Sequence, residues 1–271
     1  MKKTLILVLI SLMCFALLSS CREGTEGLEY FKEDSGNYVV EAGDAKHFKN
    51  IEIPSKYRFK KVVGIADNAF EDCTELETII IPDTVTYIGE KAFKGCTSLK
   101  SVVIPDGVKI IEANAFDGCT SLESVVISGS VETIESHAFG DCESLESLVI
   151  SEGVKTIEKT AFIECDSLRS VVIPDSVTFI GQSAFMECSK LESVTIGKGV
   201  KTIDNYAFSL CESLNMVVMG DAVTSIGHNV FSNYDENFVL YYAGSAEEFS
   251  RISVGDGLED IKVSYNYNYE Q

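Results

Sequence analysis

The sequence predicts a repeat solenoid of the α/β class, mostly parallel β with short helical turns, and capped at both ends. Two observations carry this prediction. A chain of 271 residues with 45% hydrophobic and 24% charged residues is expected to fold rather than remain disordered. In addition, phenylalanine and cysteine each recur every 23 residues over most of the chain. The two columns are Phe70, Phe93, Phe116, Phe139, Phe162, Phe185, Phe208 and Phe231, and Cys73, Cys96, Cys119, Cys142, Cys165, Cys188 and Cys211.

One repeat unit is too small to bury its own apolar side chains, so it must stack on copies of itself. Each unit contains a short β-branched triplet, which predicts a strand, and these strands would stack in register about 4.8 Å apart. Proline ends several of them, because it cannot donate the next ladder hydrogen bond. The Ala-Phe pair of each unit predicts a single helical turn, and about eight coils are expected in all. The triplets lie at 79–81, 102–104, 125–127, 148–150 and 171–173, and the prolines are Pro82, Pro105 and Pro174.

The repeat unit reads Leu-x-x-Val-x-Ile-Pro-x-x-Val-x-x-Ile-x-x-x-Ala-Phe-x-x-Cys, as it stands from Leu99 onward. It resembles the 23-residue BspA-like class of leucine-rich repeats, which occurs in bacterial cell-surface proteins. The resemblance is strong over residues 51–231 and extends to a terminal segment at 239–249. It implies a leucine-rich-repeat fold and a role in adhesion at the cell surface.

The N-terminal segment predicts export. Lys2 and Lys3 precede an apolar run at 5–18, which is too short for a comfortable membrane span and typical of a signal peptide. The run ends in Leu-Ser-Ser-Cys, which resembles the bacterial lipobox and implies lipid attachment at Cys21; the alternative is an ordinary signal peptide with a chance cysteine. The expected organisation is a signal peptide at 1–20, a lipidated tether at 21–27, an N-terminal cap at 28–54, a solenoid at 55–236 and a C-terminal cap at 237–271.

Two further features of the ends are visible in the sequence. Between Pro54 and Val62 there are eight positions where later repeats have three, so the first coil carries a five-residue insertion. Near the other end, Ser245 is expected to cap a short helix that has Glu247 and Glu248 in its first turn.

The charge balance of the chain restricts its partners. Its 22 Lys and Arg residues against 42 Asp and Glu residues give a formal net charge of -20. Such acidity argues against nucleic acid and against peripheral docking on anionic lipid headgroups. Contact with the membrane is therefore expected only through the lipid anchor.

No residue pattern indicates catalysis, a cofactor or a metal. The sequence contains no metalloprotease, nucleophile-elbow or phosphate-loop motif. His47, His137 and His228 lie in non-equivalent or well-separated places. The seven repeated cysteines are interpreted as small buried thiols that fill one corner of each coil; an occasional disulfide between neighbouring coils remains open.

The candidate binding face is the outer side of the strand triplets. Because side chains alternate along a strand, one β-branched column should point to solvent beside a column of serines. An exposed apolar ribbon of this kind can mark an interaction site, although β-branched residues also simply suit a pleated sheet. The candidate residues are Ile80, Val103, Val126, Val149, Val172, Thr195 and Val218, with Ser124, Ser147 and Ser170.

The predicted function is therefore non-catalytic. The leading hypothesis is a cell-surface lipoprotein that binds a host or bacterial surface protein, a matrix protein or a glycan through this face. The alternative hypothesis is a structural or accessory lipoprotein that docks a fixed partner within the cell envelope.

Overall fold

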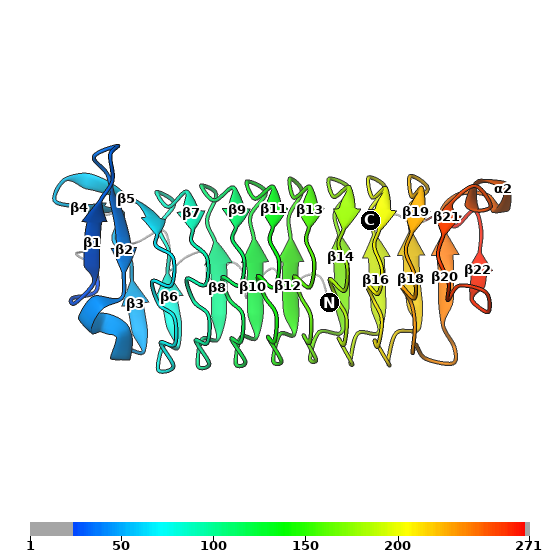
Figure 1. Cartoon of the computed structure of the whole chain (residues 1–271), viewed down its shortest axis with the longest axis horizontal. Coiled ribbons are helices and arrows are strands. Elements are labelled where there is room, and N and C mark those ends of the chain that lie inside the picture. The colour runs from blue at the N-terminus through cyan, green and yellow to red at the C-terminus, as the bar shows by residue number, and fades with distance from the viewer. Residues whose placement is uncertain (1–23, 269–271) are drawn as a thin grey trace.

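The structure is a computed structural model that describes residues 24–268. It is a parallel β-solenoid of about 10 turns, somewhat more than the eight coils expected (Figure 1). The predicted signal peptide at 1–20 and the predicted lipid attachment at Cys21 lie outside the described residues.

One long sheet of 12 strands runs the length of the solenoid. After the hairpins at its N-terminal end, each coil contributes one two-residue strand to it, and each of these strands pairs in parallel with the equivalent residues of the next coil. Its members are β1 (Glu29–Lys32), β2 (Tyr38–Glu41), β4 (Lys56–Tyr57), β5 (Lys60–Ile65), β7 (Tyr87–Ile88), β9 (Ile110–Ile111), β11 (Thr133–Ile134), β13 (Thr156–Ile157), β15 (Phe179–Ile180), β17 (Thr202–Ile203), β19 (Ser225–Ile226) and β21 (Ser253–Val254).

The predicted triplets form the opposite face of the solenoid, which we call the open sheet face. It consists of two sheets of five strands each. Paired strands stack in register with an offset of 23 residues, except that the first pair has an offset of 28 because the five-residue insertion lies between its strands. One half contains β3 (Asn50–Glu52), β6 (Thr78–Ile80), β8 (Ser101–Ile104), β10 (Ser124–Ile127) and β12 (Ser147–Ile150). The other contains β14 (Ser170–Ile173), β16 (Ser193–Ile196), β18 (Met216–Met219), β20 (Val239–Tyr242) and β22 (Lys262–Ser264).

The core is a set of stacked columns. The phenylalanine rings from Phe70 to Phe208 lie nearly parallel, with centroids 5.0–5.3 Å apart and interplanar angles of 1–9°. The seven column cysteines are buried and free, as interpreted from the sequence. Most of their thiols donate to the phenylalanine carbonyl of the preceding coil; for example, Cys96 Sγ lies 3.1 Å from the Phe70 oxygen. The thiols therefore join neighbouring coils by hydrogen bonds, with no disulfide among them.

The predicted helical turn at each Ala-Phe pair is wrong. The segment is a run of tight turns in which successive amides take different partners. The Phe70 amide donates to Ala92 of the next coil at 2.7 Å, whereas the Glu71 amide donates back to Asn68 at 3.1 Å. Asn68 and Asp72 both have φ of 56°, and the later coils repeat this conformation. A helix would direct every amide along its own axis, and the bonds from this segment to the next coil would then be lost.

Short helices occur only near the ends of residues 24–268. A 3-10 helix, η1 (Gly43–His47), follows the β1–β2 hairpin, and α2 (Ala246–Phe249) lies in the C-terminal cap. The expected cap at Ser245 is present. Its hydroxyl accepts from the Glu248 amide, and the Glu248 carboxylate accepts from the Ser245 amide, which together form a capping box.

Candidate interaction face

Alternation along the open strands sets which side chains reach solvent. In β8, Val102 and Ile104 are buried while Val103 is 43% exposed, and β14 repeats this pattern around Val172 at 57%. Parallel register then aligns equivalent residues, so that Val103 pairs with Val126 of the next coil. The strand register therefore aligns the β-branched side chains in one outer column.

The candidate residues differ in how far they reach solvent. Val103, Ser170 and Val172 are exposed, whereas the remaining members apart from Val218 are half-buried: Ile80, Ser124, Val126, Ser147, Val149 and Thr195.

Val218 is not part of an accessible surface, and its prediction is wrong. Its side chain is only 5% exposed. Its register partner in β20 is Tyr241, and the Tyr241 ring lies 4.7 Å from that of Tyr267. Aromatic side chains of the C-terminal cap thus replace the β-branched residues of earlier coils and close this end of the column.

The open sheet face is interrupted at its middle. β12 and β14 are neighbours in Figure 1, yet no ladder pairing joins them, and the face consists of two halves. The column of Ile80, Val103, Val126 and Val149 belongs to one half. The long sheet on the opposite side continues across this position through β13 and β15, and therefore holds the two halves in one stack.

Charged side chains flank the open strands and pair between coils. Lys49 Nζ lies 2.7 Å from Glu77 Oε1, and Arg169 Nη1 lies 2.7 Å from Glu192 Oε1. The hydrogen bond from Lys49 lowers the pKa of the Glu77 carboxyl. Both pairs are solvent-exposed, so each contributes little to stability and mainly neutralises charge beside the face.

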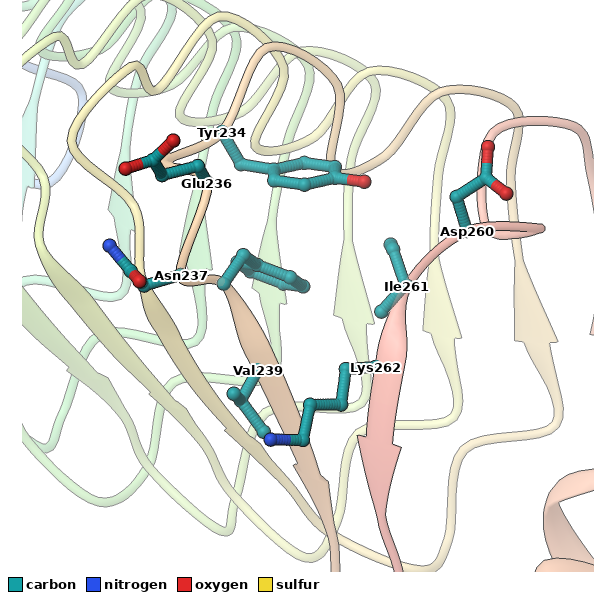
Figure 2. A pocket seen from close by; sticks show the side chains of 8 residues that line it. Tyr234, Glu236, Asn237, Val239, Asp260, Ile261 and Lys262 are labelled. Atoms are coloured by element: carbon teal, nitrogen blue, oxygen red, sulfur yellow. The ribbon is translucent and has the colours of Figure 1, made fainter.

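A pocket of about 300 Å³ opens in the C-terminal cap, and the sequence reasoning missed it. Figure 2 shows Tyr234 on one side of the opening, with Ile261 and Lys262 on the other. Asp260 and Glu236 add carboxylates at the rim, with no nucleophile beside a base. The one signal in the sequence is the end of the cysteine column, whose next position is occupied by Tyr234.

The histidines and cysteines of residues 24–268 lie in separate parts of the solenoid. No group of three metal-ligating side chains could hold an ion there. The histidines lie apart, with Nδ1 of His47, His137 and His228 near Glu75, Thr160 and Asp256, respectively. Burial raises the pKa of the Cys73 thiol to about 11 and that of Cys119 to about 12, so these thiols stay protonated and unreactive at neutral pH. In this same part of the chain, no helix is both long and apolar enough to cross a bilayer.

Comparison with known proteins places this geometry among bacterial repeat proteins. The model of the family described as "BspA type Leucine rich repeat region" matches residues 44–169 and 132–251, in six copies. No match is found among curated proteins.

Two solved structures show the same architecture. A leucine-rich repeat protein from Bacteroides ovatus is 26% identical with a TM-score of 0.66, over 90% of this chain and 67% of that chain. A leucine-rich repeat protein from T. pallidum is 27% identical with a TM-score of 0.58, over 79% of this chain and 89% of that chain.

Proposed function

The chain belongs to the family of BspA-type leucine-rich repeat regions, and from this premise we propose that it is an exported, lipid-anchored protein of the bacterial cell surface whose open sheet face binds a protein or glycan. Repeats of this family generally serve as protein-interaction modules rather than catalysts. The lipid is attached at Cys21, and the solenoid is displayed outside the cell. In this proposal the chain contacts the membrane through this anchor.

The observation that supports this proposal most is the uncovered β-branched column. Val103 and Val172 are large apolar side chains with 43% and 57% of their surface exposed, on strands whose other face is fully packed. Rigid strands hold these side chains in place, so little conformational entropy is lost when a partner binds. The serines beside them supply hydroxyl groups that both donate and accept hydrogen bonds.

The location is tested by protease treatment of intact and permeabilised cells. Cleavage on intact cells supports display at the surface. Complete protection until permeabilisation refutes it and favours an accessory lipoprotein that docks a partner inside the envelope.

The face is tested by paired substitutions. Residues 22–271 contain the whole described core, which spans Leu28 to Ile252, and can be screened against matrix proteins, surface proteins and glycans. Val103→Glu with Val172→Glu should weaken binding at least about tenfold, because a carboxylate must then be buried against the partner. The matched control is Ile110→Glu with Val254→Glu, which places the same two charges at 38% and 40% exposed apolar sites on the long sheet. Equal effects of the two variants would show that the open sheet face is not the binding surface.

A further inference from the structure

The five-residue insertion in the first coil forms a hairpin with a strained tip. β4 and β5 pair antiparallel, and only Arg58 and Phe59 connect them. Both have positive φ, 45° and 65°, as a two-residue hairpin turn of type I′ requires. Such positions favour Asn and Gly, and a bulky side chain there destabilises the fold. An arginine and a phenylalanine therefore occupy two positions whose backbone conformation favours neither residue.

The side chains of this hairpin differ from the rest of the surface. Phe59 is 99% exposed. No acidic residue lies between Glu52 and Asp67, whereas the hairpin carries four cations in a chain of net charge -20. The four are exposed, and within residues 24–268 none forms an ion pair: Lys56, Arg58, Lys60 and Lys61.

The base of the hairpin is rigid. Tyr57 stacks on Tyr30 with centroids 3.9 Å apart and meets the edge of Tyr38 at 5.1 Å. Lys56 lies directly opposite Lys61 in the ladder, an arrangement of like charges that destabilises a hairpin. Packing thus holds in place a tip that combines backbone strain, charge repulsion and an exposed ring.

The hairpin starts beside the point where the described chain begins. The Thr25 amide donates to Glu52 O at 2.9 Å, and the Glu52 amide donates to Thr25 Oγ1 at 2.7 Å. Gly24 lies so close to Pro54 that a Cβ on it would be 2.3 Å from the proline ring. Cys21 is three residues before Gly24, a distance of at most about 10 Å. β4 begins two residues after Pro54, at the N-terminal end of the solenoid in Figure 1.

We propose that the tip of the β4–β5 hairpin is a second membrane contact: Phe59 enters the headgroup region, and the four surrounding cations bind anionic lipid. This inference rests on the proposed lipid at Cys21 for its setting, since that lipid brings the hairpin to the bilayer. A lipid is a single point of attachment, which by itself sets no direction for the solenoid. A second contact beside it fixes the direction in which the coils leave the membrane. The acidic body, kept from anionic lipid by its own charge, then extends away from the surface.

The contact is tested with unlipidated residues 22–271 and vesicles of phosphatidylcholine, with and without phosphatidylglycerol. Binding should require phosphatidylglycerol and fall with salt. Lys56→Ser with Lys60→Ser should weaken it about 25-fold, since each cation near an anionic surface contributes about fivefold. The matched control, Lys155→Ser with Lys201→Ser, removes two exposed lysines elsewhere and should change binding less than about twofold. Equal losses in the two variants, or no preference for the anionic vesicles, would overturn the proposal.

A second variant separates membrane binding from folding. Arg58→Asn with Phe59→Gly supplies the favoured type I′ turn, so it should raise the melting temperature while weakening vesicle binding at least about tenfold. Unchanged vesicle binding in this variant overturns the proposal. If the hairpin binds only an acidic peptide and not vesicles, the membrane assignment is likewise wrong. Neither result bears on partner binding at the open sheet face. The lipid at Cys21 is tested separately, by measuring the mass of the native protein.

Discussion

The stacked phenylalanine column offers the sharpest test of what holds the coils together. Phe139 is fully buried between Phe116 at 5.1 Å and Phe162 at 5.3 Å, whereas Phe70 has a ring on one side only, Phe93 at 5.1 Å. Phe→Leu removes a similar amount of apolar surface at both fully buried positions. A stacked aromatic pair contributes about 0.5–1.5 kcal/mol beyond its buried area. Phe139→Leu should therefore destabilise the protein by about 0.5–1.5 kcal/mol more than Phe70→Leu.

Urea denaturation of residues 22–271, followed by circular dichroism, measures this difference. Both variants should keep the wild-type spectrum and the wild-type dependence of stability on urea, because neither changes the strand register. A terminal coil can fray before the rest of a solenoid, so a changed slope for Phe70→Leu would be read as partial unfolding. Equal losses for the two variants with unchanged slopes would refute a role of ring stacking and leave burial as the sole contribution of the column.

Three further predictions follow from the core, the acidic surface and the C-terminal cap. At neutral pH the column cysteines should resist a thiol reagent in the native protein and react in urea, because all seven are buried and burial raises the pKa of a thiol such as that of Cys142; mass spectrometry counts the labels, and fast native labelling would contradict this. Burial, reinforced by the charge of Glu135, raises the pKa of Glu112 and Glu158 in the folded protein. These two carboxyls therefore destabilise the native state as the pH rises above their usual pKa of 4.5. Glu135→Gln should therefore stabilise the protein at pH 7 by roughly 1 kcal/mol, with the gain disappearing below about pH 4.5; an equal gain at both pH values in thermal melts would show that charge is not the cause. Ser245→Ala should cost about 1 kcal/mol by removing the capping box, whereas Ser245→Asp, which still accepts the Glu248 amide, should cost less in the same melts.

The repeat period predicted the strands and the core because one spacing determines both. Once Phe139 is placed inside, the 23-residue offset places its equivalents inside too, and alternation then turns Val103 and Val172 outward. The turn conformation could not be read from the same pattern. A turn whose amides bond to the next coil and a turn of helix share local i→i−3 bonds, and the difference lies in contacts with the neighbouring coil.

Other departures from prediction lie where the repeat stops or changes. Val218 is covered because Tyr241 and Tyr267 of the cap lie at the end of the column, and neither belongs to a repeated position. The insertion before Val62 is visible in the sequence, but its left-handed tip at Arg58 and Phe59 follows from how β4 must return to β5. The interruption between β12 and β14 falls after the strand in which Leu148 takes the place that valine holds in β10 and β14.

The free cysteine column has a consequence for the biogenesis of the protein. In the exported setting proposed above, seven thiols enter an oxidising compartment on a chain that has not yet folded, and any two of them could be joined incorrectly. A solenoid can fold by adding one coil to the next, and each coil that docks removes its own thiol from the reach of an oxidant. Correct maturation then depends on whether each coil docks before its thiol is oxidised. Fast folding favours docking, and a delay at one coil leaves the thiols of all later coils exposed to oxidation.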